Sequence, residues 1–282
     1  MGKVCLVLEG GGTRGAYTSG VLDAFIDCNI DIKSVYGVSA GALNALSYLS
    51  KQKGRSLFVS KQVALNSKYV NYKRIFSSEG VLNLDSLLDV NNEDIPPFDL
   101  EEFNKREKFV VTCTNIVTGA PVYKEIEDYN RDLPYIKASA SLPLFTKIVE
   151  VDSLKLLDGG VSDSIPVVKA IEDGYDKVVV VLTRDKEFVS NQYKFMRAYA
   201  LKYFKYRWLI LTMKNRFNKY NVIRDVIGKY VEENKVLAIY PSEKIVIGNL
   251  EKNEGKIEEI YKLGYKDACS MASKIKEFME GK

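Results

Sequence analysis

The stretch KVCLVLEGGGTRG at residues 3–15, together with SVYGVSAGALNAL at residues 34–46, decides the fold class of this 282-residue chain. Each stretch opens with a compact apolar run rich in β-branched residues, which is typical of a buried strand. Small residues then lead into a segment whose apolar side chains recur at helical spacing, as they do over residues 16–28. Strand, turn and helix therefore follow one another twice near the start of the chain.

The same alternation continues along the chain. Buried strands are predicted over residues 3–8, 34–38, 109–114, 154–157 and 177–183. Helical segments separate most of these strands, and such alternation indicates an α/β fold in which a sheet lies between two layers of helices.

The second stretch contains Gly37-Val38-Ser39-Ala40-Gly41, the Gly-x-Ser-x-Gly spacing that places a nucleophilic serine on a tight turn between a strand and a helix. The chain contains no histidine. This absence excludes a Ser-His-Asp triad and every histidine-ligated zinc site. A nucleophilic Ser39 would therefore need a carboxylate or a lysine to accept its proton.

The glycine-rich loop at residues 9–15 is open to several interpretations. Its spacing matches a dinucleotide-binding loop, but that fold needs an acid at the end of the second strand, which here leads into Ser39. Ala16 and Tyr17 stand where a P-loop needs Lys and Ser or Thr. A glycine loop before a helix could instead aim N–H groups at a developing oxyanion, or form a plain tight turn. Arg14 could add charge to such a site, orient the loop or lie in solvent.

The base that Ser39 needs is sought at the end of another strand, and Asp158 in LLDGG at residues 156–160 is the best candidate. An isolated aspartate has a pKa near 3.9 and is a weak base, so an apolar setting would have to raise its pKa. The alternative is an ordinary Asp-Gly turn.

These motifs, in this order, resemble those of the patatin-like phospholipases: a Gly-Gly-Gly-x-Arg-Gly loop, a Gly-x-Ser-x-Gly turn and a later Asp-Gly-Gly. ASASLPLF at residues 138–145 is similar to the family's segment before the aspartate motif, and the likeness covers about residues 3–185. Ser164 departs from the family, many members of which carry Asn there. The resemblance implies an α/β/α patatin-like fold with a central, mostly parallel sheet.

The resemblance also implies the roles of the site residues. Ser39 is the expected nucleophile and Asp158 the expected general base of a dyad that works without histidine. The supporting positions are Gly10, Gly11, Gly12, Thr13, Arg14 and Gly15 in the oxyanion loop, Gly37 and Gly41 in the serine turn, and Gly159 and Gly160 in the aspartate motif.

The activity implied by the resemblance is cleavage of carboxylic esters of lipids by a serine acyl hydrolase, without metal or cofactor. A lipid or small ester is the expected substrate. Two alternatives stay open: an esterase or thioesterase that acts on soluble substrates, and a lipid-binding protein without activity.

For the domain organisation we expect a catalytic core over residues 1–185, since 46% apolar residues are enough to fill one sizeable core. Within it, residues 51–108 are polar and helix-prone, are broken by Pro96-Pro97, and could form a helical cap beside the site. Residues 186–282 form an extension, a basic helical segment followed by a strand and a helix, packed on the core.

The basic segment over residues 186–230 carries eleven Lys or Arg and two acids, although the net charge of the chain is only +4. Its aromatic residues could meet anionic lipid headgroups, or pack on the core while the lysines stay solvated. Nucleic acid is not an expected partner, because no recognised binding motif accompanies the charge. The aromatic residues interleaved with the cations include Tyr193, Tyr199, Tyr203, Phe204, Tyr206, Trp208 and Phe217.

The apolar runs, such as residues 178–182, are far shorter than the roughly 20 residues that cross a bilayer. The first residues match neither a signal peptide nor a myristoylation signal. We therefore expect a cytoplasmic protein, with peripheral contact at the inner face of the membrane as an option.

Overall fold

Helices and strands alternate along the computed structural model, which describes residues 2–71, 73, 80–89, 92–191, 196–248 and 251–281. Its elements in chain order are β1 (Val4–Leu8), η1 (Gly12–Arg14), α1 (Gly15–Asp27), β2 (Ser34–Val38), α2 (Ala40–Leu49), α3 (Arg55–Leu65), α4 (Leu84–Leu87), α5 (Leu100–Phe103), β3 (Lys108–Asn115), β4 (Pro121–Glu125), α6 (Tyr129–Ser139), β5 (Val149–Val151), β6 (Leu154–Asp158), η3 (Gly159–Val161), α7 (Val167–Glu172), β7 (Lys177–Val181), α8 (Met196–Lys202), α9 (Arg207–Glu232), β8 (Val236–Ile239) and α10 (Glu254–Glu280).

The strands form one eight-stranded sheet in the order β5-β6-β3-β2-β1-β7-β8, with β4 also paired to β3. The run from β3 to β8 is parallel, whereas β4, β5 and β6 join by antiparallel pairing. The predicted central, mostly parallel sheet is thereby confirmed. The sequence analysis missed β4 and β5, since β5 has only three residues and β4 is half-exposed and begins with proline.

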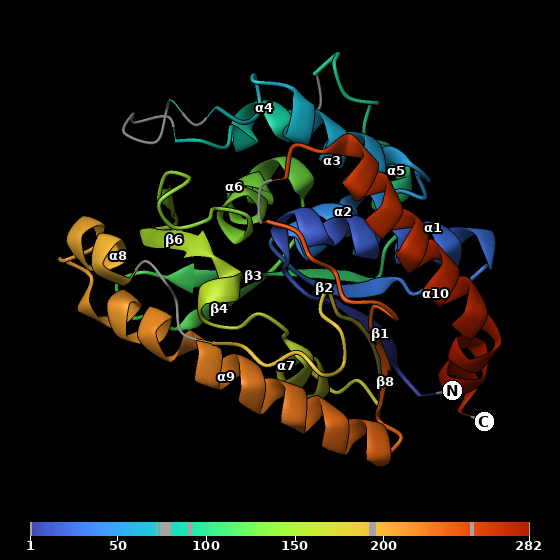
Figure 1. Ribbon diagram of the computed structural model, residues 1–282. Coiled ribbons are helices and arrows are strands. Elements are labelled where there is room, and N and C mark those ends of the chain that lie inside the picture. The colour runs from blue at the N-terminus through green and yellow to red at the C-terminus, as the bar shows by residue number, and fades with distance from the viewer. Residues whose placement is uncertain are drawn as a thin grey trace.

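Side chains alternate between the two faces of the sheet, and each face has its own helical layer. Leu6 and Leu8 of β1 join the core beneath α1, α2 and α10, whereas Cys5 and Val7 join the core against α7 and α9. Figure 1 shows these two layers on opposite sides of the sheet. The three-layer architecture is therefore as predicted. Among the described residues, no helix combines the length and apolarity needed to cross a bilayer.

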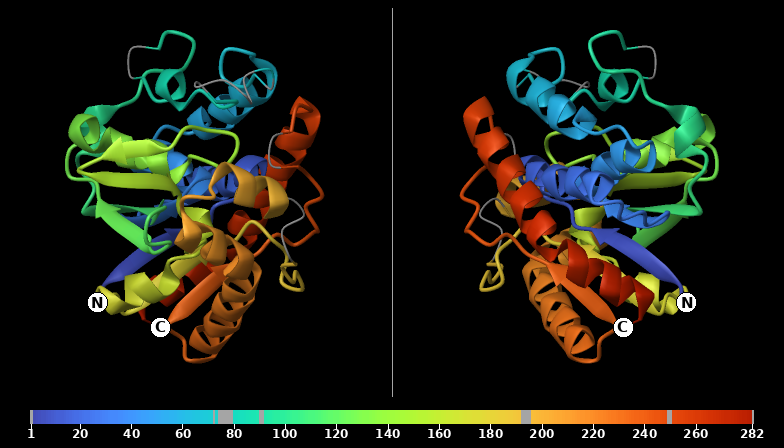
Figure 2. Two further views of the ribbon diagram at one scale, coloured as in Figure 1. Left: turned by 90° about the vertical axis from the view of Figure 1, so that its left-hand side faces the viewer. Right: turned by 90° about the vertical axis from the view of Figure 1, so that its right-hand side faces the viewer.

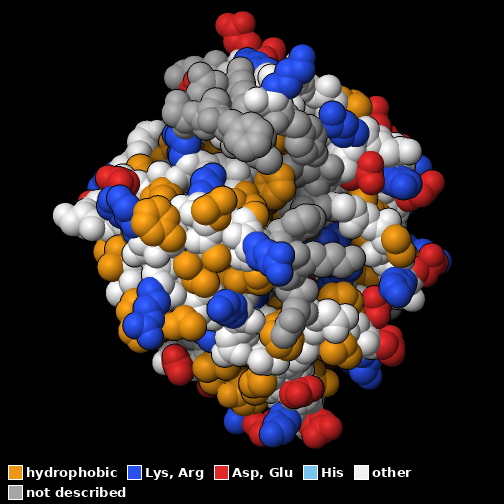
Figure 3. All heavy atoms as spheres, turned by 60° about the vertical axis from the view of Figure 1, so that its left-hand side comes forward, with side chains coloured by type: hydrophobic (Ala, Val, Ile, Leu, Met, Phe, Trp, Pro, Cys, Tyr) orange, Lys and Arg blue, Asp and Glu red, His pale blue; other side chains and the backbone are white. Residues whose placement is uncertain are grey.

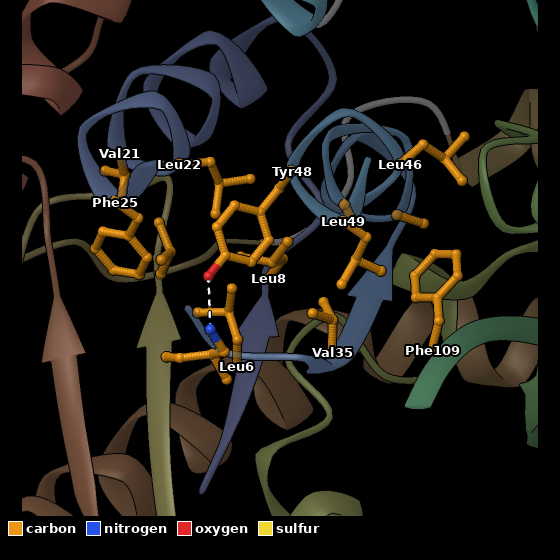
Figure 4. Close-up of a cluster of buried hydrophobic side chains, with 14 of the residues drawn as sticks. Leu6, Leu8, Val21, Leu22, Phe25, Val35, Leu46, Tyr48, Leu49 and Phe109 are labelled. Atoms are coloured by element: carbon orange, nitrogen blue, oxygen red, sulfur yellow. Dashed lines mark hydrogen bonds between the residues drawn. The ribbon is translucent and has the colours of Figure 1, made fainter. Parts of the chain in front are cut away.

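A hydrogen-bonded tyrosine lies within the core beneath α1 and α2, as Figure 4 shows. Tyr48 of α2 points down among Leu6, Leu8 and Phe25, and its hydroxyl accepts a hydrogen bond from Ile32 N at 2.8 Å. The same hydroxyl donates to the carbonyl of residue 30 at 2.9 Å. Because a buried hydroxyl must find partners, Tyr48 fixes the loop that leads into β2.

The C-terminal segment contributes to every layer of the fold. Strand β8 extends the sheet by pairing parallel to β7. Helix α9 packs on one face, and α10 packs along α1 on the other (Figure 2). The segment is thus part of the structure that holds the sheet.

Helices α1 and α10 approach closely at two glycines. A Cβ atom added at Gly20 would lie 2.0 Å from Tyr261 O, and one added at Gly264 would lie 2.1 Å from Tyr17 O. Next to this contact, Tyr17 donates to the buried Asp267 at 3.1 Å, and Asp267 also accepts from Ser242. The contact therefore leaves no room for a side chain.

We expect Gly264→Ala to lower the free energy of unfolding by about 1–3 kcal/mol, because the added methyl group must push α10 away from α1. Gly228→Ala in α9 is the matched control, since no atom lies within 4 Å of its Cβ position. That variant should gain roughly 0.5–1 kcal/mol from helix propensity. Urea unfolding of both variants is the measurement, and equal effects would contradict the assignment of a tight contact.

Candidate active site

Ser39 and Asp158, 119 residues apart in the chain, are in direct contact. Ser39 Oγ donates a hydrogen bond to Asp158 Oδ2 at 2.6 Å. Both side chains are buried, with 6% and 3% of their surface exposed. The two residues singled out by the sequence as nucleophile and base therefore lie together.

Strand β3 determines where these two residues meet. Strand β2 runs parallel to β3 as far as the pair Val38–Thr112, and β6 runs antiparallel to β3 and ends at the pair Asp158–Cys113. Strand β4 pairs with residues 110–114 of β3, a stretch that includes residues paired with β2 and residues paired with β6. Because a strand has only two edges, β2 and β6 must share the other edge and point at each other end to end. Ser39, directly after β2, then faces Asp158 at the end of β6.

Ser39 occupies a strained turn between β2 and α2. Its φ of 53° and ψ of −122° lie in a region that residues with a Cβ atom rarely adopt. The turn is tied by Ser39 N, which donates to Ser139 Oγ at 3.0 Å. Gly41 passes so close to β1 that a Cβ atom there would lie 2.4 Å from Leu8 O, and Gly37 is similarly crowded by Ala42. This geometry places Ser39 beyond the end of β2, where it lines a pocket.

The aspartate motif is fixed by hydrogen bonds to its main chain and side chain. Asp158 Oδ1 accepts from Gly160 N at 2.7 Å, and Asp158 N donates to Ser141 O at 2.8 Å. The Asp158 carbonyl accepts from Thr114 Oγ1 at 2.8 Å. Gly159 lies against β3, where an added Cβ atom would be 2.1 Å from a carbonyl oxygen.

Burial raises the pKa of Asp158 from 3.8 to about 6. The hydrogen bonds from Ser39 and Gly160 N and the positive charge of Arg216 oppose this rise. The apolar setting that the sequence analysis required of a base is therefore present. Near neutral pH the carboxylate stays largely ionised, yet it binds a proton more readily than an exposed aspartate does.

The glycine loop lies beside Ser39. A Cβ atom at Gly10 would lie 3.1 Å from Ser39 Cβ, so a larger residue there would crowd Ser39. Gly12 has a φ of +56°, which turns the chain sharply into η1. Within the described chain, the N–H groups of Gly11 and Gly12 donate no hydrogen bond, whereas those of Gly10 and Gly15 do. Of these two residues, Gly12 lines the pocket that contains Ser39.

Arg14 lies in a network of charged residues beside the loop. Its neighbours are Arg184, Glu9, Tyr220 and Arg216, and it does not belong to the described lining of the pocket that contains Ser39. Burial, followed by repulsion from Arg184, lowers the pKa of Arg14 to about 10, while Glu9 opposes the shift. The side chain is partly buried in this network, which excludes a solvated position.

Helix α9 reaches the site from the C-terminal segment. Arg216 Nε donates to Gly160 O, and Ser164 Oγ donates to the same carbonyl at 2.8 Å. One turn further, Tyr220 donates to the buried Glu9 at 2.7 Å. Glu9 also accepts from Thr183 N at 2.6 Å. Helix α9 therefore holds the main chain just after Asp158 and the side chain of Glu9 just before the glycine loop.

An apolar pocket opens in front of Ser39 and has a volume of about 100 Å³. Two charged side chains, Arg55 and Glu251, also line it. Much of the apolar lining comes from residues 51–108, the segment predicted as a cap, of which residues 72, 74–79, 90 and 91 lie outside the described chain. The apolar residues that line the pocket outside the serine turn are Leu43, Leu46, Val59, Val63, Ala64, Leu82, Leu87, Leu88, Ala140 and Leu142.

Sequence reasoning missed the residues that hold the segments around Ser39 and Asp158. Ser139 and Ser141 lie in the ASASLPLF stretch, so the motif could have indicated them. Thr114, Glu9 and Arg216 carry no local signal, because each acts through a contact with a distant part of the chain. Within the described ranges, no three Cys, Asp or Glu side chains cluster as metal ligands would.

A family model described as patatin-like phospholipase matches residues 6–171, more than half of the chain. A second model, described as a domain of unknown function (DUF6363), matches residues 206–280. The first contains the glycine loop, the serine turn and the aspartate motif, and the second contains α9 and α10.

Individual proteins are similar to this chain in sequence or in fold. An uncharacterized protein of Escherichia coli strain K12, YjjU, is 28% identical over 93% of this chain and 75% of its own length. Lysophospholipase NTE1 of Candida glabrata is 26% identical over 92% of this chain but only 15% of its own length. VipD from Legionella pneumophila has the same fold, with a TM-score of 0.53 at 12% identity over 97% of this chain and 67% of its own.

We expect the rate of Ser39 labelling by a fluorophosphonate to rise with pH and level off, with a midpoint near pH 6, because Asp158 must be ionised to accept the proton. Arg216→Met should move the midpoint upward by about half a unit to one unit, since it removes a cation that favours the carboxylate. Arg216→Lys should restore it, and Arg207→Met is the control on the same helix. A slower rate with an unmoved midpoint would mean that Arg216 acts only on the fold.

Asp158→Asn should stabilise the folded protein at alkaline pH. The pKa of Asp158 is about 6 in the folded state and 3.8 in the unfolded state. Its contribution to the free energy of unfolding is therefore fully present below about pH 4 and is lost as the pH rises through about 6. The variant should therefore gain up to about 3 kcal/mol at pH 8, at 1.36 kcal/mol per pKa unit. Denaturant unfolding at pH 8 and pH 4 tests this, with the exposed Asp225→Asn as the control. An equal gain at both pH values would contradict the raised pKa.

Proposed function

The chain belongs to the patatin-like phospholipase family, and from that premise we propose that it hydrolyses carboxylic esters of lipids with a Ser39–Asp158 dyad. The observation that carries the proposal is the 2.6 Å hydrogen bond between the two side chains at the edge of an apolar pocket. A pocket of this kind suits an acyl chain, and the hydrogen bond suits proton transfer.

In the proposed mechanism, Asp158 Oδ2 accepts the proton of Ser39 Oγ while the oxygen attacks the ester carbonyl carbon. The tetrahedral intermediate then collapses, the bond to the leaving alcohol breaks, and the proton on Asp158 passes to that alcohol. Water next attacks the acyl-enzyme, gives a proton to Asp158 and releases the fatty acid. The final proton transfer returns Ser39 to its hydroxyl form.

The developing negative charge on the carbonyl oxygen needs donors that are already in position. We assign this role to the N–H groups of Gly11 and Gly12, with the adjoining Thr13 completing the loop. Gly12 and Thr13 line the same pocket as Ser39, which supports the assignment. Each such donor is typically worth on the order of 10² to 10³ in turnover.

Two other functions would use the same fold. An esterase or thioesterase for soluble substrates would use the dyad without lipid, and a lipid-binding protein would hold an acyl chain without turnover. The short hydrogen bond and the raised pKa of Asp158 favour an enzyme, because neither is needed to bind an acyl chain.

The first experiment is fluorophosphonate labelling followed by intact-mass measurement, together with hydrolysis of a lysophospholipid and of a short water-soluble ester. We expect one label per wild-type chain and none on Ser39→Ala. Asp158→Asn should lose about 10² to 10⁴ in ester hydrolysis, the usual contribution of a positioned base. A strong preference for the soluble ester would favour the esterase alternative, and full activity of Ser39→Ala would refute the dyad.

A further inference from the structure

The basic aromatic segment divides into a buried and an exposed set of side chains. Tyr199, Tyr203 and Tyr220 are buried, as the core-packing alternative expects, whereas Tyr193 lies outside the described residues. Four large apolar side chains at the end of α8 and the start of α9 remain exposed. They are Leu201 at 80%, Phe204 at 69%, Trp208 at 57% and Leu211 at 41% of their surface.

These four residues are not needed for packing. Helix α9 faces the core with Leu209 and Met213, and Trp208 and Leu211 lie on its other side, one turn apart. We call the four apolar residues, together with the neighbouring cations Lys202, Lys205 and Arg207, the α8–α9 face.

The charge of the α8–α9 face has a single sign. No Asp or Glu occurs in the sequence between Glu187 and Asp225. Among the described residues, no ion pair involves a cation of the face. Lys205 Nζ lies 5.7 Å from the centre of the Phe204 ring, and Arg207 Cζ lies 5.9 Å from that of Trp208.

Apolar and basic side chains intermix on the side of the molecule that carries this face, as Figure 3 shows, and acidic side chains lie toward the edges of the view. The face is also joined to the active site. Tyr203, between its exposed neighbours, accepts a hydrogen bond from Leu144 N at 3.1 Å, and Lys202 Nζ donates to Leu144 O at 3.4 Å. Leu142, two residues earlier, lines the pocket of Ser39.

We propose that the α8–α9 face docks on a bilayer that contains anionic phospholipid and brings the pocket of Ser39 to the membrane surface. Aromatic rings beside cations match the boundary between acyl chains and headgroups, where rings enter the apolar layer and cations meet phosphates. The uniform positive charge selects an anionic bilayer. This inference deepens the proposed function, since it states how a lipid substrate reaches the dyad.

Trp208 allows a direct test, because it is the only tryptophan of the sequence. The full chain carrying Ser39→Ala is mixed with vesicles of phosphatidylcholine alone, or with added phosphatidylglycerol. On the anionic vesicles we expect a blue shift of the Trp208 emission and quenching by brominated acyl chains. Binding should weaken as salt rises from about 0.1 M to about 1 M, where the screening length falls from about 10 Å to about 3 Å.

Variants separate the parts of the face. We expect vesicle binding to weaken at least about tenfold when the double variant Lys205→Glu with Arg207→Glu reverses two charges of the face. The matched control reverses two charges on α10, Lys274→Glu with Lys276→Glu, and should change binding less than about twofold. Phe204→Ser should also weaken binding and, in the otherwise wild-type chain, leave labelling of Ser39 and hydrolysis of a soluble ester unchanged.

The outcomes distinguish this inference from the proposed function. Three outcomes would overturn the docking face and leave the proposed dyad untouched. They are an unshifted Trp208 emission, equal binding to both kinds of vesicle, and an equal loss of vesicle binding in the α10 control. A dimer in solution that Phe204→Ser dissolves would overturn it in favour of a second copy of the chain. Vesicle binding without any labelling of Ser39 would support the face and refute the enzyme.

Discussion

The hydrogen bond between Ser39 and Asp158 depends on the length of β3. This strand extends beyond the end of β2, and the extension pairs with β6, which arrives from the opposite direction. The sheet thus sets the separation of Ser39 and Asp158 by its register. The close contact of Gly159 with the β3 backbone keeps that register, since a larger residue would force the end of β6 away. The glycine loop and the pocket are arranged around a pair that the sheet has already fixed.

Local sequence was sufficient for the central strands, because buried strands leave patterns within a few residues. It also indicated Ser39 and Asp158 as candidates, which the structure brings into contact, although the spacing alone left Asp158 open to being an ordinary turn. It was insufficient for β4 and β5, which are short and partly exposed and so lack a continuous apolar run. Arg216 and Tyr220 could not be identified, since nothing near them in the chain indicates that they contact Gly160 and Glu9. The basic segment was ambiguous for a physical reason. Tyrosine has an apolar ring and a polar hydroxyl, so Tyr203 can be buried while Phe204, beside it, is exposed.

The boundary between the two family models does not coincide with a boundary in the structure. Strand β8 covers an edge of β7 that would otherwise present unpaired backbone groups, and α9 holds the carbonyl of Gly160 next to the proposed base. Burial of the Asp158 carboxylate at the end of β6 raises its pKa and lowers the stability of the fold. The contacts from α9 offset part of that loss, so the C-terminal segment supports the site as well as the sheet.

The contact between α1 and α10 also has a consequence for the growing polypeptide. Tyr17 and Asp267 are 250 residues apart, and α1 is buried between the sheet and a helix that is synthesised long after it. Native pairing over such a separation forms slowly and only after both partners have left the ribosome. Until then the outer surface of α1, which directly follows the glycine loop, has no cover. A nascent chain therefore carries every motif of the site before α10 exists to cover α1, and the complete fold can form only after α10 has been made.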